Sequence, residues 1–168
     1  MRAAPPPSPP RRRLFFLITL AFPWLLLALV ELGLRVGGYG SASPLFVAHP
    51  LQRDWLVVNP EAGRRWFRGS AFVPTPETDF FRASKAPGAL RLFFMGESSA
   101  QGFPYGHGGM PSRMLEQRLQ ATFPGRDVEV VNTAFTAVNS FTLVDQAGEI
   151  ADQAPDAVLV YAGHNEWY

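Results

Sequence analysis

The chain has 168 residues, 47% of them hydrophobic, and a formal net charge of +1, which is enough for one small folded domain. Cysteine is absent, and this excludes a disulfide framework, a thiolate zinc site and a cysteine nucleophile. Five of the 15 basic residues but one of the 14 acidic residues precede position 36, so 10 basic and 13 acidic residues remain after it. This slightly acidic remainder argues against nucleic-acid binding.

The first 34 residues have the pattern of a membrane anchor. Residues 1–13 form a proline-rich arm that ends in three arginines, and we expect this arm to be disordered and cytoplasmic. Residues 14–30 carry no charge, and residues 14–34 are long enough for one transmembrane helix in contact with lipid; Pro23 is tolerated there. Arginines ahead of the span predict that all later residues lie outside the cytoplasm. A cleaved signal peptide, with a site near residues 41–43, is the alternative, but the apolar run is long for one.

Residues 35–88 have no clear periodicity. Glycines and prolines recur among scattered aromatic residues, so we expect an extracytoplasmic lead-in that wraps the domain with few regular elements.

Residues 89–168 have the pattern of an α/β domain. Three short apolar runs, at residues 89–95, 128–132 and 157–161, are typical of strands buried on both faces of a parallel sheet. The residues between them predict two helices. The first begins near Pro111, stops at Pro124-Gly125 and has Met114, Leu115, Leu119 and Phe123 on one face. The second is capped by Asn139 or Ser140, ends at Pro155 and repeats apolar residues from Leu143 to Ala154.

The order β-α-β-α-β is half of a doubly wound fold, in which ligands bind at the carboxyl ends of the strands. Polar segments follow each predicted strand there: residues 96–99, 132–140 and 163–166. Ser98 follows a glycine that permits a sharp turn, as an exposed nucleophile does, although a lone serine more often caps a helix. Asn165 and the backbone N–H groups of Ser98 and Ala137 are candidate donors to an oxyanion, although Asn165 alone is as readily a turn cap.

Together the three segments resemble the SGNH, or GDSL-like, hydrolase superfamily. Residues 95–99 resemble its first block, with the nucleophile at Ser98, and residues 132–137 resemble the second, whose glycine donates a backbone N–H. Residues 163–166 resemble the third block, whose asparagine, here Asn165, completes the oxyanion hole. Residues 100–105 and 161–166 resemble a bacterial membrane-anchored subgroup that often carries tetratricopeptide repeats. The resemblance implies a flavodoxin-like, three-layer α/β/α fold with a parallel sheet, and no cofactor or metal.

The chain departs from this family in three ways. Glu97 replaces an aspartate, which we expect to matter little, and Ala137 replaces the glycine while keeping its N–H. The family's Asp-x-x-His segment, which supplies the base, does not occur in the 168 residues, so we expect a fragment that stops after the third strand and is inactive alone. His107, in a glycine-rich loop, has the pattern of a solvated residue rather than a substitute base, and His49, His107 and His164 lack metal-ligand spacing.

These observations predict a membrane-anchored extracytoplasmic serine hydrolase for ester bonds, whose substrate is an ester or an acylated envelope glycan. Acetyl transfer to or from such glycans uses the same acyl-enzyme chemistry and is a close alternative. The rival from another class is a non-catalytic, membrane-anchored binding module with an SGNH-like fold that presents residues 102–110 to a partner.

Overall fold

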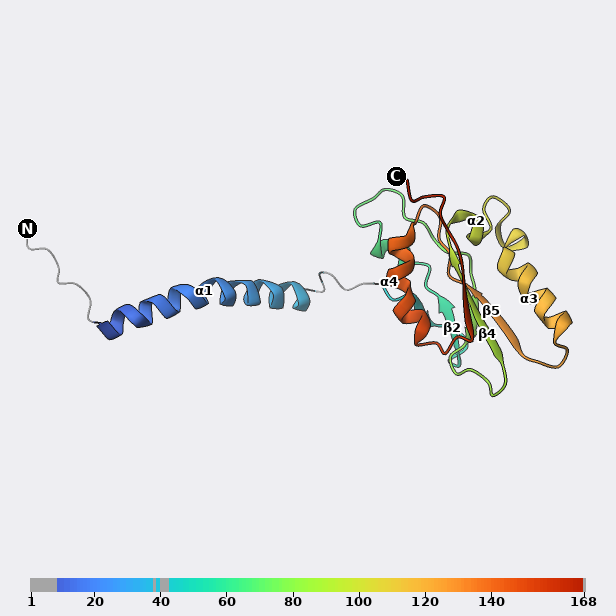
Figure 1. Cartoon of the computed structure of the whole chain (residues 1–168), viewed down its shortest axis with the longest axis horizontal. Helices are drawn as coiled ribbons and strands as arrows, with labels where there is room; N and C mark the ends of the chain where they lie inside the picture. The colour runs from blue at the N-terminus through green and yellow to red at the C-terminus, as the bar shows by residue number, and fades with distance from the viewer. Residues whose placement is uncertain (1–8, 38, 40–42, 168) are drawn as a thin grey trace, which may run out of the picture. The chain divides into compact units, whose positions relative to one another are not determined.

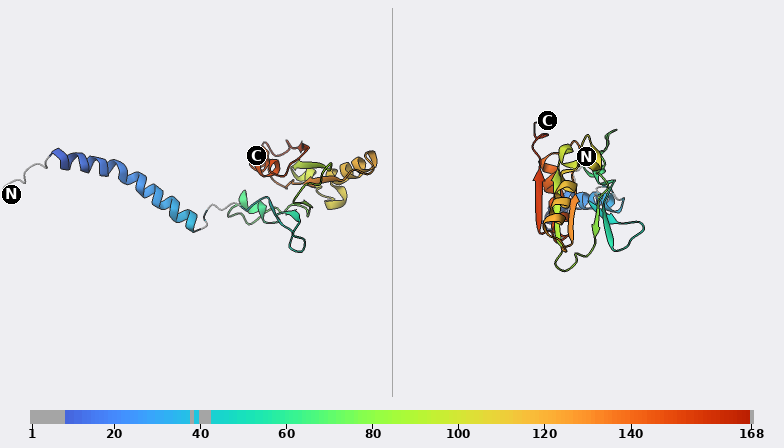
Figure 2. Two further views of the ribbon diagram at one scale, coloured as in Figure 1. Left: turned by 90° about the horizontal axis from the view of Figure 1, so that it is seen from below. Right: turned by 90° about the vertical axis from the view of Figure 1, so that its right-hand side faces the viewer.

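The structure, a computed structural model, describes residues 9–37, 39 and 43–167, and the chain divides into two compact units on either side of residue 41. The unit before this point contains one helix, α1 (Pro9–Val36), of 28 residues. At 1.5 Å per residue it is about 42 Å long, and it is long and apolar enough to cross a membrane. Figure 2 shows it as one continuous helix, with Pro23 inside it.

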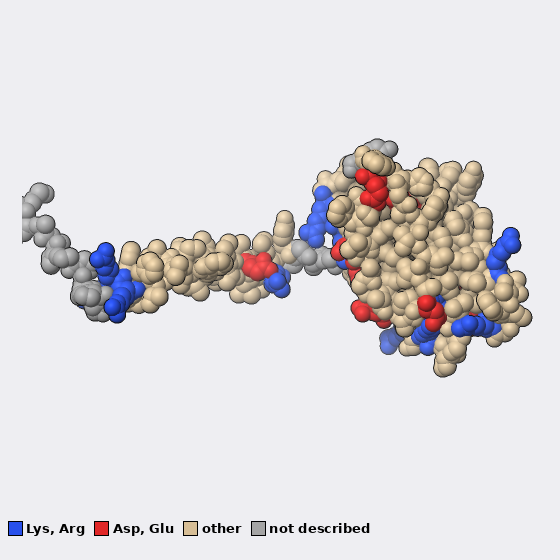
Figure 3. All heavy atoms as spheres, in the orientation of Figure 1, with Lys and Arg blue, Asp and Glu red and all other residues tan. Residues whose placement is uncertain are grey.

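The charges of α1 lie at its two ends. Figure 3 shows basic side chains at its start, a stretch without charge, and an acidic and a basic group near its end. The last two are Glu31 and Arg35, whose Nε donates to Oε1 at 2.7 Å, so the acid near the end of this apolar helix has a neutralising partner. Because α1 begins at Pro9, Arg11 to Arg13 are helical and do not belong to a disordered arm; residues 1–8 lie outside the described residues.

The centre of the second unit is a parallel sheet of three strands in the order β5-β4-β6. Its strands are β4 (Leu90–Gly96), β5 (Val128–Asn132) and β6 (Ala157–Tyr161), and they lie within one residue of the predicted ranges. The prediction of a parallel sheet in an α/β fold is therefore confirmed. The connecting helices are α3 (Pro111–Thr122) and α4 (Ser140–Ala151), with the short α2 (Ser98–Gln101) and the 3-10 turn η2 (Gly106–Gly109) between β4 and α3.

The two helices cover opposite faces of this sheet, as Figure 1 shows. Leu92 and Val130 pack against Leu115 and Leu119 of α3. Alternate residues of the same strands, such as Phe93, point to the other face and pack with Leu143 and Ile150 of α4. This alternation follows from the two-residue period of a strand, and it buries β4 and β5 on both faces. The expectation that the run at residues 157–161 is also buried on both faces was wrong, because most of β6 is exposed.

A second sheet, antiparallel and in the order β1-β2-β3, precedes the parallel one. It consists of β1 (Phe46–Ala48), β2 (Trp55–Val58) and β3 (Phe80–Arg82), with the 3-10 turn η1 (Ala62–Arg65) after β2. Phe81 of β3 meets Phe46 and Phe93 edge-on, Phe46 and Phe93 are tilted to each other, and the three rings join the α4-side core. Residues 35–88 thus hold few and short regular elements, but these include an antiparallel sheet that the sequence pattern did not indicate, and the segment packs onto the domain.

Only part of the apolar stripe predicted for the second helix is buried. Leu143 and Ile150 are buried in the core, whereas Val144 is 76% exposed and faces a groove that it shares with Val158 and Val160 of β6. The groove has a volume of about 470 Å³, and β6 pairs only with β4 among the described residues. In the first helix, Met114 and Phe123 are likewise exposed, so the predicted face is correct only for its leucines.

Candidate functional site

The three polar segments lie at one edge of the sheet because β4, β5 and β6 run parallel and end there. Figure 1 shows α2 and the C-terminal segment at the same end of these strands. Gly96 closes β4 against β6: a Cβ on this residue would lie 2.1 Å from the carbonyl oxygen of Tyr161. Glycine is therefore required here for close backbone approach, and the chain can turn directly into Glu97 and Ser98.

Glu97 connects the first polar segment to the third. Its side chain is buried, and its Oε1 accepts the N–H of Gly163 at 2.8 Å. Its Oε2 accepts the N–H groups of His164 at 2.9 Å and Asn165 at 3.1 Å. The residue beside the candidate nucleophile thus holds the backbone of the candidate oxyanion residue, a role that the sequence did not reveal.

The side chain of Asn165 connects the third segment to the second. Its Nδ2 donates to the carbonyl oxygen of Val138 at 2.8 Å, and the side-chain amide has a second N–H for another acceptor. Glu166 adds a further contact, because its carboxylate accepts the N–H and the hydroxyl of Ser140 at 2.7 and 2.9 Å. Asn139 occupies the N-cap position of α4, as predicted, but its side chain makes no cap hydrogen bond, and the hydroxyl of Ser140 donates to Glu166 instead.

The second segment is also bound to the first. The Nδ2 of Asn132 donates to the carbonyl oxygen of Ala100 at 2.8 Å, and the hydroxyl of Thr136 donates to Gln101 at 2.6 Å. Ala137 follows with φ of 58°, a left-handed conformation that is uncommon for any residue other than glycine. This conformation sets the direction of the Ala137 N–H at an exposed position.

Ala137 and Asn165 line one cavity of about 410 Å³, together with Val138 and Asn139. Ser98 does not line this cavity; it is half-buried at the start of α2 and is tied to Asn165 through Glu97. Within the described part of the chain, neither Ser98 N–H nor Ala137 N–H donates a hydrogen bond, and the Ser98 hydroxyl makes none. Ala137 and Asn165 thus share a cavity, and Ser98 directly follows Glu97, whose carboxylate holds the backbone of Asn165.

Among the described residues, no histidine makes a hydrogen bond with Ser98. His164 is the nearest by sequence: its Nδ1 lies 3.7 Å from Oε2 of Glu97, its side chain is 60% exposed, and its ring contacts Tyr161 edge-on. His107 is exposed in η2 and lines a different cavity, and His49 accepts the N–H of Leu51. Over residues 9–37, 39 and 43–167, no three acidic or histidine side chains gather as a metal site requires.

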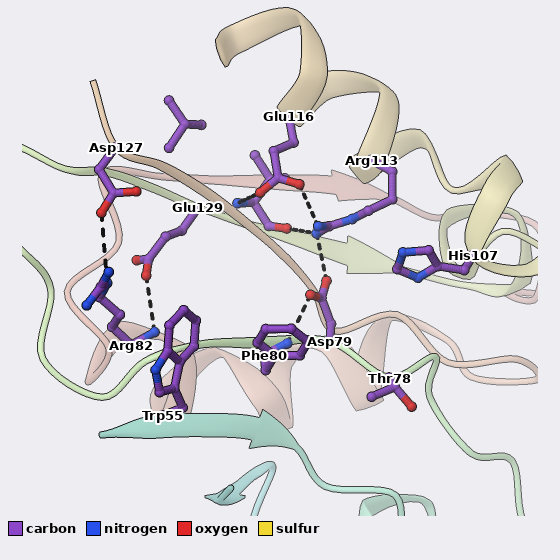
Figure 4. A pocket seen from close by; sticks show the side chains of 12 residues that line it. Trp55, Thr78, Asp79, Phe80, Arg82, His107, Arg113, Glu116, Asp127 and Glu129 are labelled. Atoms are coloured by element: carbon purple, nitrogen blue, oxygen red, sulfur yellow. Dashed lines mark hydrogen bonds and ion pairs between the residues drawn. The ribbon is translucent and has the colours of Figure 1, made fainter. Parts of the chain in front are cut away.

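His107 lines a charged cavity of about 290 Å³ beside β5, shown in Figure 4. Asp79 accepts the N–H of Asn132 at 2.8 Å and pairs with Arg113 at 2.8 Å, and Glu116 accepts the N–H of Val130. Burial raises the pKa of Asp79 to about 6 and outweighs the opposing effect of Arg113 and the backbone N–H groups. Asp79 and Glu116 thus accept backbone N–H groups of β5 that no described strand pairs with, which is a structural role.

No family model, no curated protein and no solved structure matches the chain.

Proposed function

We propose that the chain is the membrane-anchored part of a serine hydrolase that acts on ester bonds, with Ser98 as the nucleophile. The observation that carries this proposal is the Glu97 carboxylate, which binds three consecutive N–H groups of the Asn165 turn directly beside Ser98. An acyl-transfer site needs a nucleophile and pre-set donors on one side of the reacting carbonyl. The N–H groups of Ser98 and Ala137 and the free amide N–H of Asn165 supply such donors.

The conformation of Ala137 supports the resemblance to SGNH hydrolases. The family has a glycine at this place, and the alanine here takes the left-handed backbone that glycine adopts most readily. The methyl group leaves the N–H available while it adds bulk to the cavity that Asn165 lines. A general base completes the proposal; by the resemblance it is a histidine of an Asp-x-x-His segment, which the 168 residues do not contain.

The proposed reaction follows from these parts. The base removes the Ser98 hydroxyl proton as Oγ attacks the ester carbonyl, and the resulting oxyanion accepts the three N–H groups. Collapse of the intermediate releases the alcohol, which takes the proton from the base, and leaves an acyl-serine that water hydrolyses by the same route. The proposed location is extracytoplasmic, and the substrate class is an ester or acylated glycan.

The test uses the protein expressed from its natural reading frame and purified in detergent. The substrate is p-nitrophenyl acetate. Ser98→Ala should abolish turnover, and Asn165→Ala should lower kcat by about 10²–10³, the usual loss for one oxyanion donor. Asn139→Ala is the matched control, because this side chain lies in the same cavity without an assigned role. Turnover that survives Ser98→Ala would refute the proposed nucleophile, and absence of any Ser98-dependent turnover would favour a binding module.

A further inference from the structure

Glu97 is a buried carboxyl side chain whose hydrogen-bond partners are backbone N–H groups. It is 1% exposed, and among the ion pairs of the described residues its sole partner is His164, at 3.7 Å and mostly exposed. A buried carboxylate without compensation is costly, so its three accepted N–H bonds are what keep it in place. Three successive N–H groups directed at one carboxylate also need an unusual turn, and Gly163 supplies it with φ of 123°.

We propose that Glu97 is the positioning residue of the site: its carboxylate sets the turn of residues 163–165 and thereby the place of the Asn165 amide relative to Ser98. This inference rests on the proposed function for its catalytic consequence. Asn165 is held at two points, its backbone N–H by Glu97 and its side chain by Val138. Because Glu97 directly precedes Ser98, its side chain connects the backbone of the nucleophile to that turn through three hydrogen bonds.

The distances in this turn favour glutamate over aspartate at this position, which departs from the expectation from the sequence that the exchange matters little. Aspartate is shorter by one carbon–carbon bond, about 1.5 Å, so its oxygens would not reach N–H groups that now lie at 2.8 to 3.1 Å. Glutamine keeps the length but presents an NH₂ group to at least one N–H donor. Both substitutions should therefore release the turn, although glutamate and aspartate carry the same charge.

The experiment measures kcat and KM with p-nitrophenyl acetate for Glu97→Gln and Glu97→Asp in the protein from its natural reading frame. We expect kcat to fall by about 10-fold to 100-fold, as for a displaced catalytic group, with KM changed less than threefold. Glu149→Gln is the matched control, because this carboxylate also accepts a backbone N–H, that of Leu45, and lies on α4 outside the site. Its kcat should stay within twofold of wild type.

A double-mutant cycle separates positioning from a general loss of structure. In an Asn165→Ala background, Glu97→Gln should lower kcat by less than threefold, because the group that it positions is already absent. An undiminished effect in that background, or a Glu97→Gln kcat within twofold of wild type, would overturn the inference.

Hydrogen exchange of the Gly163, His164 and Asn165 amides tests the clamp without any activity. Glu97→Gln should accelerate their exchange at least 10-fold, whereas Glu149→Gln should not. Unchanged exchange would refute the clamp. Accelerated exchange in a protein without esterase activity would leave the clamp standing and would refute the proposed function instead.

Discussion

Replacement of Arg91 tests how the two sheets of the domain are held together. Arg91 lies on the central strand β4, is 1% exposed and faces Glu129 in the register of β4 with β5. Its Nε donates to Glu129 at 2.7 Å, and its Nη groups donate to the carbonyl oxygens of Gln153 at 2.9 Å and Arg82 at 2.7 Å. One guanidinium therefore joins β5, the segment after α4 and the end of β3.

Arg91→Met keeps most of the side-chain volume and removes every one of these bonds. Glu129 would keep the backbone N–H of Arg82 as a partner but would lose the cation that compensates its burial. Removal of one partner from a buried pair costs about 3–5 kcal/mol, a large part of the roughly 5–15 kcal/mol that stabilises a typical domain. We expect this loss in chemical denaturation of the full chain in detergent, followed by tryptophan fluorescence.

The double variant Arg91→Met, Glu129→Leu should recover part of that loss, because no uncompensated charge stays buried. Lys85→Met is a suitable control, since its ion pair with Asp156 is more exposed and should contribute less than about 1 kcal/mol. A cost below about 1 kcal/mol for Arg91→Met, or no recovery in the double variant, would refute the argument.

Three further predictions concern other parts of the chain. The folded pKa of Asp79, about 6, lies above its ordinary value, so the stability that its protonation contributes is complete below about pH 4 and is lost as the pH rises through 6. Relative to the Asp79→Asn variant, the free energy of unfolding of the wild type should therefore rise by up to about 3 kcal/mol from pH 7 to pH 4 in denaturation curves. An unchanged free energy of unfolding would contradict the raised pKa. Val160 is 61% exposed on β6 where it borders the groove beside α4, so Val160→Lys should cost less than about 0.5 kcal/mol in denaturation curves; a loss above about 1 kcal/mol would show that this face is covered. Alkaline phosphatase fused after residue 168 should be active in a bacterial host, whereas activity of a cytoplasmic reporter alone would reverse the proposed orientation.

The parallel sheet could be predicted because its apolar runs are nearly continuous and lie close to glycine or proline residues. The runs at residues 90–96 and 128–132 are buried on both faces, as such sequences indicate, whereas the run at residues 157–161 is largely exposed. The strands β1 to β3 could not be found in this way. They are three or four residues long, and Phe46 and Phe81 owe their places to contacts with Phe93, which is remote in sequence.

For the candidate site, sequence patterns indicated the residues but not the interactions between them. Ser98, Ala137 and Asn165 follow from strand ends and from the resemblance, whereas Glu97 stood out only as a departure from it. A buried carboxylate that accepts three backbone N–H groups has no sequence signature, because its partners are 66 to 68 residues away. Its one available sign was an acidic residue directly after a buried strand, where a charge needs compensation.

The central claim, that Ser98 is an activated nucleophile, is tested most directly by covalent labelling. The protein from its natural reading frame should be incubated with a fluorophosphonate probe, digested and analysed by mass spectrometry. We predict one adduct on the peptide that contains Ser98, its loss in Ser98→Ala, and no adduct on the 168-residue chain, which has no Asp-x-x-His segment. Absence of the Ser98 adduct in the protein from the natural reading frame, or an adduct on another serine, would contradict the account.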